Sequence, residues 1–277
     1  MNIQRDERAH ARMREKRARC TPRPQLEDYS RKYELYFRMK RDNGVLEVQM
    51  HSDGGPAIYD LKLHNDWAQL WYDIGNDPEN EVLIFSGTGD KWLDYAERSQ
   101  YEESLADLPA DSFYDHQFAD SMKLLESLIF NVDIPTISCI NGPGFHTEFA
   151  LLCDITLCAE HAVLFDPHFE IGLVPGDGQG LVFQELMGLK RAAYYMYTAD
   201  KIDARTALDM GLVNEVMPVD ALLPRAHEIA AKIMKQPRAT RRLTSAVIRR
   251  PWKRLLVQDL GYHMAHEMMG IRLDATV

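Results

Sequence analysis

Apolar and polar positions along the chain follow two alternating periods. Residues 34–40 and 45–51 alternate with period two, and the Asp42-Asn43-Gly44 triplet between them predicts a hairpin. Residues 61–74 and 113–130 have helical spacing, and the first of these helices should stop at Asn76-Asp77-Pro78. Short apolar runs at 82–85 and 136–140 predict buried strands, with a polar loop over 88–110. Strands that alternate with helices predict an α/β core containing a parallel sheet.

The pattern becomes helical throughout after Pro218. Three helices are predicted, over 221–234, 239–248 and 252–272, with breaks at Pro237 and Pro251. Residues 1–25 differ from everything that follows, since seven arginines and one lysine face only three acids. We therefore expect a flexible basic arm over residues 1–30, an α/β core over 31–218 and a helical region over 219–277.

Charge and composition narrow the class of protein. The 277 residues carry a formal net charge of −10, which argues against a nucleic-acid partner. No apolar run approaches the roughly 20 residues that span a membrane, and no secretory signal is present, so a cytoplasmic protein is expected. Three of the four cysteines lie in apolar segments and are interpreted as small core residues of a reducing compartment.

The candidate chemistry is concentrated between residues 141 and 180. His146, Glu148, His168 and Asp177 stand there among glycines and apolar runs, and polar residues between core segments tend to converge at one end of a sheet. His168 and Asp177, nine residues apart, could form a dyad in which the carboxylate fixes the tautomer of an imidazole that activates water. His263 and His266 have ligand-like spacing but lack an accompanying carboxylate pattern, so no metal is predicted.

Each of these residues also has a purely structural interpretation. Asp177 precedes a predicted helix and could be its N-cap, and Glu148 could be an exposed carboxylate at a helix start. His146 and His168 could be hydrogen-bonded core-edge and loop residues. Glu267 could lie on a solvated helix face, and His64 could simply open a helix.

Five separated motifs resemble the crotonase superfamily, the enoyl-CoA hydratase and isomerase fold. In the family's order they are SGTG at 86–89, NGPG at 141–144, EFALLCDITLCAE at 148–160, GLVPGDGQG at 172–180 and DARTALDMGLVNEV at 203–216. The resemblance covers the chain from about residue 33 onward. It implies a ββα spiral core and a C-terminal helical region that builds a homotrimer or a dimer of trimers.

Departures from the hydratase pattern point to one branch of that superfamily. The resemblance places Glu148 on the first of two glutamates that face one water in acyl-CoA hydratases, but His168 stands at the second. Residues 90–95 replace an Ala-Gly-Asp segment that lines the thioester site. PHF before GLVPGDG, LLPRA, and AHE at 265–267 are similar to the oxocamphor hydrolase-like β-diketone hydrolases.

The resemblance to that branch implies a retro-Claisen hydrolase that needs neither cofactor nor metal. His168 and Asp177 would activate water, His146 would bind a carbonyl oxygen, and Glu267 would return a proton to the enolate. Backbone N–H groups near Leu93 and Gly144 would form the oxyanion hole. The remaining site residues implied are Glu148, and for substrate binding His64, Trp92 and Phe145.

Two other functions remain open at this stage. An acyl-CoA hydratase, isomerase or thioester hydrolase would bind acyl-CoA stoichiometrically. A catalytically silent crotonase-like scaffold would be indifferent to replacement of His168.

Overall fold

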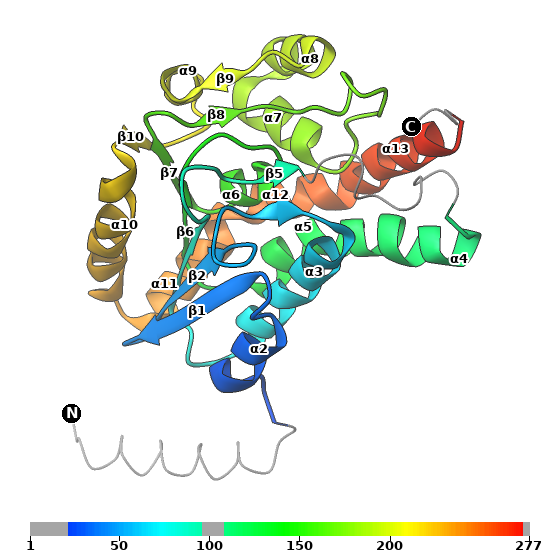
Figure 1. Cartoon of the computed structure of the whole chain (residues 1–277). Coiled ribbons are helices and arrows are strands. Elements are labelled where there is room, and N and C mark those ends of the chain that lie inside the picture. The colour runs from blue at the N-terminus through cyan, green and yellow to red at the C-terminus, as the bar shows by residue number, and fades with distance from the viewer. Residues whose placement is uncertain (1–21, 96–107, 274–277) are drawn as a thin grey trace, which may run out of the picture.

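A six-stranded sheet forms the centre of the molecule in the computed structural model, which describes residues 22–95 and 108–273 (Figure 1). Its strands lie in the order β1-β2-β4-β6-β7-β10. Only the β1–β2 hairpin is antiparallel, and all later pairs are parallel, which confirms the predicted α/β class. The strands are β1 (Phe37–Asp42), β2 (Val45–Met50), β4 (Val82–Ser86), β6 (Thr136–Ile140), β7 (Ile155–Ala159) and β10 (Glu215–Met217).

Two small sheets lie beside the large one and are joined through a single glycine. β3 (Ile58–Tyr59) pairs with β5 (Asp94–Tyr95), and β8 (Val163–Leu164) pairs with β9 (Ile202–Asp203). Gly144 forms bridges to Leu93 on one side and to Leu164 on the other. A Cβ atom on Gly144 would lie 2.6 Å from the backbone nitrogen of Leu93, so this approach excludes any side chain. The close approach fixes the loop that carries His146.

Helices cover the sheet where the apolar spacing predicted them. α3 (Leu61–Asn76) packs against α5 (Asp120–Asn131), and its buried face carries Trp67 and Trp71. The predicted helix over 113–130 is present, but it opens with α4 (Ala110–Ser112) and a wider π-helical segment, η3 (Phe113–Ala119). The remaining helices of the core are α6 (Glu148–Leu151), α7 (Gln179–Met187), α8 (Leu189–Thr198) and α9 (Ala204–Asp209).

The aromatic core lies between the sheet and α3. The rings of Trp67 and Phe149 lie 4.1 Å apart at a tilt of 31°, and Phe85 contacts both Trp67 at 6.1 Å and Trp92 at 5.3 Å, measured between ring centroids. Each of these four side chains is fully buried or nearly so. Rings of this size dominate core energetics, so the core supports Trp92 and Phe149 on either side of the loop that begins at Gly144.

The predicted basic arm ends earlier than expected. α2 (Leu26–Lys32) already belongs to the folded core, because Tyr29 is buried and its hydroxyl donates to Asp77 Oδ2 at 3.0 Å. Burial of that ring overrides the charged composition on which the boundary at residue 30 was based. Residues 1–21 lie outside the described part of the chain.

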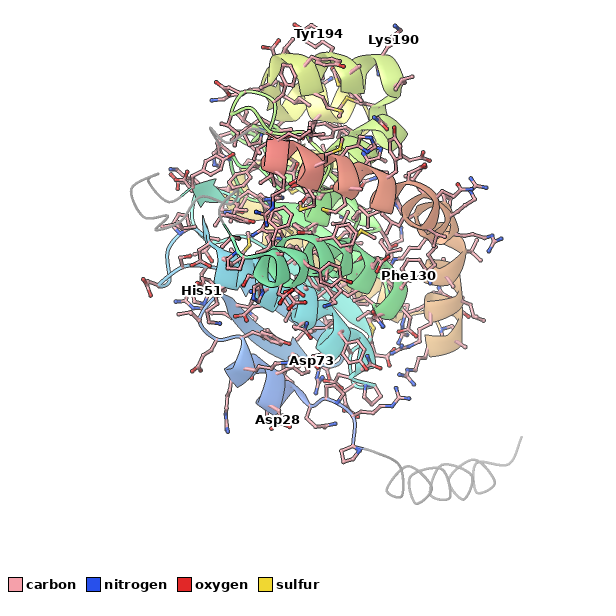
Figure 2. All side chains as sticks on the ribbon, turned by 90° about the vertical axis from the view of Figure 1, so that its right-hand side faces the viewer. Asp28, His51, Asp73, Phe130, Lys190 and Tyr194 are labelled. Atoms are coloured by element: carbon pink, nitrogen blue, oxygen red, sulfur yellow. The ribbon has the colours of Figure 1, made fainter. Side chains whose placement is uncertain are left out.

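The three predicted C-terminal helices are confirmed, with the third divided by a π-helical turn. They are α10 (Val219–Met234), α11 (Arg238–Ile248) and the run of α12 (Arg250–Leu255), η4 (Leu256–Leu260) and α13 (Gly261–Leu273). α10 packs on β6 and β7, whereas α13 turns back against α5 and η3. Figure 2 shows α13 between those helices and α8, which carries Lys190 and Tyr194. Within the described residues, no helix combines the length and apolarity needed to cross a bilayer.

A buried arginine fastens this C-terminal region to the sheet. Arg249, only 2% exposed, binds Asp154 in bidentate fashion, with Nε at 2.8 Å from Oδ1 and Nη2 at 2.6 Å from Oδ2. The same guanidinium donates to the carbonyl oxygens of Val132 and Ile134 just before β6. The α11–α12 junction is thus tied to the segments that lead into β6 and β7.

Replacing Arg249 with alanine would leave the Asp154 carboxylate buried without its cation. We expect the free energy of unfolding to fall by about 3–5 kcal/mol. Urea unfolding followed by circular dichroism should show this as a lower midpoint at unchanged slope. Arg205→Ala removes an exposed 3.4 Å pair with Asp209 and serves as the control, with little expected change. Equal midpoints for the two variants would contradict a stabilising role of the Arg249–Asp154 ion pair.

Candidate active site

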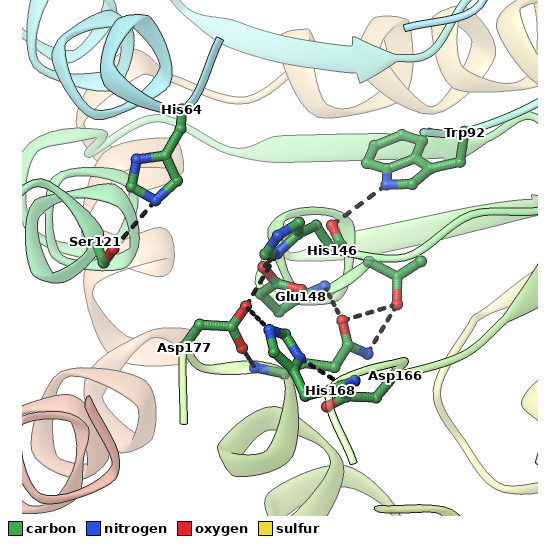
Figure 3. A network of polar contacts seen from close by, with 10 residues as sticks. His64, Trp92, Ser121, His146, Glu148, Asp166, His168 and Asp177 are labelled. Atoms are coloured by element: carbon green, nitrogen blue, oxygen red, sulfur yellow. Dashed lines mark hydrogen bonds and ion pairs between the residues drawn. The ribbon is translucent and has the colours of Figure 1, made fainter. Parts of the chain in front are cut away.

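The predicted catalytic residues converge on one buried site from separate segments. Figure 3 shows His146, Glu148, His168 and Asp177 in this site. His146 comes from the loop between β6 and α6, Glu148 is the first residue of α6, and His168 follows β8. Asp177 precedes α7, and Glu267 comes from α13 of the same chain. Ligand atoms of His168, Asp177 and Glu267 lie within 4.8 Å of one another, as do those of His146, Glu148 and Asp177. The convergence expected from their spacing among core segments is therefore present.

His146 is held in a strained backbone conformation. Its φ is +50°, which is uncommon for a residue other than glycine and costs about 1–3 kcal/mol. Trp92 Nε1 donates to the His146 carbonyl oxygen at 3.3 Å. The imidazole Nδ1 then lies 2.8 Å from Glu148 Oε1 and 3.2 Å from Asp177 Oδ2. The strain places the ring between two carboxylates.

His168 is paired through a residue that the sequence analysis did not single out. Its Nδ1 lies 2.6 Å from Asp166 Oδ1, whereas its Nε2 lies 3.5 Å from Asp177 Oδ2. The predicted pairing of His168 with Asp177 is thus corrected. Nδ1 of His168 is hydrogen-bonded to Asp166, and Asp177 lies near the other ring nitrogen, Nε2. The Asp-Pro-His triplet at 166–168 could have indicated this pairing, but such a triplet is more typical of a turn.

Asp177 lies between the two imidazoles. Its Oδ2 faces both rings, while Oδ1 accepts only a long 3.4 Å bond from the backbone N–H of Gln179. Gly178 occupies the N-cap position of α7, and no side chain caps that helix. The N-cap interpretation therefore accounts for one oxygen at most, and the other belongs to the site.

Glu148 is sealed within the protein. It has no exposed surface, so the alternative of a solvated carboxylate at a helix start is wrong. Its backbone N–H donates to Gln179 Oε1 at 3.2 Å, and Gln179 Nε2 donates to Thr147 Oγ1 at 2.9 Å. Gln179, another residue absent from the sequence prediction, thus locks α6 to α7.

Glu267 reaches the site because α13 packs directly on the loop before α7. A Cβ atom on Gly176 would lie 2.3 Å from the His263 carbonyl oxygen and 2.7 Å from Glu267 Cβ, so only glycine permits the contact. Glu267 is 6% exposed, and its Oε2 has no hydrogen-bond partner in the described residues. The solvated-face interpretation of Glu267 is therefore wrong.

Burial and neighbouring charge shift the pKa values of the cluster in opposite directions. Burial, reinforced by the charge of Asp177, raises the pKa of Glu267 to about 8, so this carboxyl is protonated at neutral pH. Burial also raises the pKa of Glu148, against the opposing effect of His146. For His168, burial favours the neutral ring, but the charges of Asp177 and Asp166 outweigh it and hold the pKa well above 6.5. The pKa of His146 is likewise raised, by Glu148 and Asp177 against burial.

The predicted substrate-binding residues do not all line accessible space. Trp92 is fully buried against Phe85 and supports the His146 loop, so it offers no surface to a substrate. Leu93 and Phe145 are 2% and 3% exposed. The Gly144 N–H donates to the Val163 carbonyl oxygen at 3.0 Å and is not available to an oxyanion. The oxyanion-hole expectation is therefore corrected at Gly144.

His64 lies apart from the cluster (Figure 3). Its Nε2 is 3.1 Å from Ser121 Oγ, and burial lowers its pKa to about 4, which keeps the ring neutral. Tyr59 connects the two regions, since its ring lies 6.1 Å from His64 and stacks at 5.1 Å on His146. Phe145 lies 5.8 Å from Tyr59 and extends this aromatic wall.

Two overlapping triads in the described residues have the composition of a metal site. They are His146, Glu148, Asp177 and His168, Asp177, Glu267. Imidazole and carboxylate ligands suit zinc, but the same atoms form the hydrogen-bonded and ion-paired network described above. The absence of a metal requirement stays a prediction of the sequence analysis.

Comparisons with known proteins agree with the fold. The family model for enoyl-CoA hydratase/isomerase matches residues 40–269. The crotonyl-CoA hydratase of Syntrophomonas wolfei subsp. wolfei is 31% identical over 175 residues, which are 62% of this chain and just under two thirds, 65%, of that relative. The carnitinyl-CoA dehydratase of Citrobacter koseri is 29% identical over 70% of this chain and 72% of its own length.

A solved structure matches a larger share of the chain. A β-diketone hydrolase from the cyanobacterium Anabaena sp. PCC 7120, bound to (S)-3-oxocyclohexyl acetic acid, superimposes with a TM-score of 0.82 and 33% identity. The match covers 88% of this chain and 97% of that one.

Proposed function

Because the chain belongs to the enoyl-CoA hydratase/isomerase family, its site can be compared with what that family's chemistry needs, and we propose that it hydrolyses a carbon–carbon bond in a β-diketone. The observation that carries the proposal is the partnered imidazole of His168. It occupies the position where the family resemblance places the second hydratase glutamate. An imidazole held by a carboxylate is a general base for water once it has lost its proton, and the raised pKa of His168 moves that loss to higher pH.

The environment of Glu148 also disfavours hydration by two glutamates. That mechanism requires two carboxylates that face one water, but Glu148 has no exposed surface and its Oε1 is bonded to His146 Nδ1 at 2.8 Å. That oxygen of Glu148 is therefore already engaged by a neighbouring side chain. Similarity to the Anabaena β-diketone hydrolase supports the same choice.

The proposed reaction assigns one role to each group. His168 Nε2 removes a proton from water, and the resulting hydroxide adds to one carbonyl carbon. Collapse of the tetrahedral intermediate breaks the bond to the central carbon and leaves its electron pair as an enolate. Protonated Glu267 then supplies the proton that converts the enolate to a ketone, and the other fragment is a carboxylic acid.

His146 is proposed to donate a hydrogen bond to the carbonyl oxygen. The Glu148 and Asp177 carboxylates raise its pKa and so favour the protonated, donating form. His64, Leu93 and Phe145 remain proposed contributors to the substrate pocket. No cofactor is part of this mechanism.

A second candidate is an acyl-CoA enzyme. It is favoured by the names of the two curated relatives, a crotonyl-CoA hydratase and a carnitinyl-CoA dehydratase. A catalytically silent scaffold is disfavoured, because strongly perturbed ionisable groups that share one buried site are characteristic of functional sites.

An assay of cyclic and linear β-diketones beside crotonyl-CoA tests this choice. We expect mass spectrometry to show addition of one water to a diketone, with no appreciable hydration of crotonyl-CoA. His168→Ala should lower turnover by about 10²–10⁴-fold, because the general base is lost. His227→Ala, which alters a half-exposed histidine paired with Glu47, is the matched control. Activity should survive exhaustive chelation.

Two outcomes of that assay would overturn the proposal. Crotonyl-CoA hydration with kcat of roughly 1–10³ s⁻¹ would favour the acyl-CoA enzyme. Diketone turnover that is lost on chelation and restored by zinc would place a metal in the mechanism.

The dependence of turnover on pH follows from the two proton carriers. Activity should rise with pH as His168 loses its proton, at a pKa above 6.5, and fall as Glu267 loses its own near pH 8. The result is a narrow bell whose alkaline limb disappears in Glu267→Gln, while the maximum falls by about 10²–10⁴-fold. An unchanged alkaline limb in that variant would remove Glu267 from the proposed proton path.

We also propose that the chain forms a trimer or a dimer of trimers through its C-terminal helices. Family members are typically oligomeric, and α11 exposes Leu243 and Val247 at 67% and 74%, one helical turn apart. Val257 in η4 and Leu273 at the end of α13 are also exposed apolar side chains, at 74% and 77%. Light scattering at micromolar concentration should give a trimeric or hexameric mass, and a Leu243→Glu/Val247→Glu double variant should reduce it. A monomeric wild-type protein would contradict the proposal.

A further inference from the structure

We propose that Asp166 is the positioning residue of His168, and that Asp177 acts on the opposite, water-facing edge of the ring. The inference rests on the proposed function for its kinetic test, but its structural test does not. Asp166 stands two residues before His168, between the motifs at 148–160 and 172–180.

One carboxylate oxygen holds both the backbone and the ring of His168. Asp166 Oδ1 accepts the backbone N–H of His168 at 3.0 Å and lies 2.6 Å from its Nδ1. Pro167 between them has a fixed φ near −65°, which reduces the entropy lost when this turn forms. Asp166 is 3% exposed, so little water competes for the bond. The three-residue segment therefore fixes the orientation of the ring largely by itself.

Charge then selects the tautomer. The nearby His168 keeps the pKa of the Asp166 carboxyl below its ordinary value despite burial, so Asp166 is ionised and accepts a hydrogen bond from the Nδ1–H group of His168. The lone pair of the neutral ring is consequently on Nε2, the edge that faces Asp177 Oδ2 at 3.5 Å. That separation exceeds a good N–H···O bond, so Asp177 influences this edge by charge more than by fixing the ring.

The other groups around His168 do not replace this function. Glu267 faces the ring from α13 and is protonated at neutral pH, since burial raises its pKa to about 8. The His146 ring lies edge-on at 6.2 Å between centroids. Asp177 Oδ2 is shared with His146 Nδ1 at 3.2 Å. Among the described residues, only Asp166 forms a hydrogen bond to the His168 ring.

The rival interpretation is that Asp166 merely shapes the turn. Asp166→Asn separates the two, because an amide oxygen can still accept the His168 backbone N–H but carries no charge. If Asp166 positions and polarises the ring, kcat should fall by up to about 10⁴-fold, with KM changed little. The acid limb of the pH profile should also move to lower pH. A turn-shaping role predicts that asparagine restores wild-type kcat and pH profile.

Nuclear magnetic resonance of histidine-labelled full-length protein tests the same point without substrate. Above the His168 pKa, ring ¹⁵N shifts should show the Nδ1–H tautomer in wild type and in Asp177→Asn, assigned by its absence in His168→Ala. In Asp166→Asn that tautomer preference should be lost, while Asp209→Asn, at an exposed side chain, should match wild type.

The kinetic experiment and the nuclear magnetic resonance experiment can be judged separately. A tautomer lost in Asp177→Asn but kept in Asp166→Asn would overturn the proposal and restore Asp177 as the orienting residue. Absence of any diketone turnover would refute the proposed function, and the ring ¹⁵N shifts would still decide which carboxylate holds His168.

Discussion

Burial of charge is the constraint on which the rest of this structure depends. His146 and His168 share one desolvated site with Glu148, Asp166, Asp177 and Glu267. Unpaired, such groups would each cost several kcal/mol. The cost is offset because each imidazole has a carboxylate within hydrogen-bond distance, 2.8 Å for His146 and 2.6 Å for His168, and because Glu267 stays protonated at neutral pH. The same compensation gives the proposed base, His168, and the proposed acid, Glu267, their protonation behaviour.

Interactions outside the site hold these groups at the required separations. Gly144 joins the two small sheets, and Trp92 then binds the carbonyl of His146 and sustains its left-handed backbone. Gln179 connects α6 to α7, which holds Glu148 and Asp177 in fixed positions relative to each other. Arg249 secures the α11–α12 junction, and the helical run that continues from it ends in α13 with Glu267. None of these residues performs chemistry, yet each limits the error in where a reacting group lies.

One family fold can support different reactions when a few side chains in the site have different hydrogen-bond partners. The family resemblance matches Glu148 and His168 to the two hydratase glutamates. In this structure Glu148 Oε1 is bonded to His146 Nδ1, and His168 is bonded to Asp166. Similarity over the whole chain therefore identifies the fold and the family, whereas the reaction follows from the local contacts. This explains how relatives with acyl-CoA names and a neighbour with a β-diketone name can share one architecture.

The sequence by itself determined the order and type of most elements, from the β1–β2 hairpin to the three C-terminal helices, because local periodicity and turn residues encode them. It also identified His146, His168 and Asp177, since polar residues between buried strands have few places to go. It placed the edge of the folded core too late, because the burial of Tyr29 depends on Asp77, far along the chain. Only the tertiary structure decided which carboxylate pairs with which imidazole, that Trp92 supports the loop while offering no surface, and that Glu267 joins its own subunit's site. Each imidazole and its carboxylate stand only two residues apart, but the apolar periodicity does not encode which side chains turn toward each other. The places of Trp92 and Glu267 depend on contacts between segments remote in sequence, which spacing along a chain does not contain.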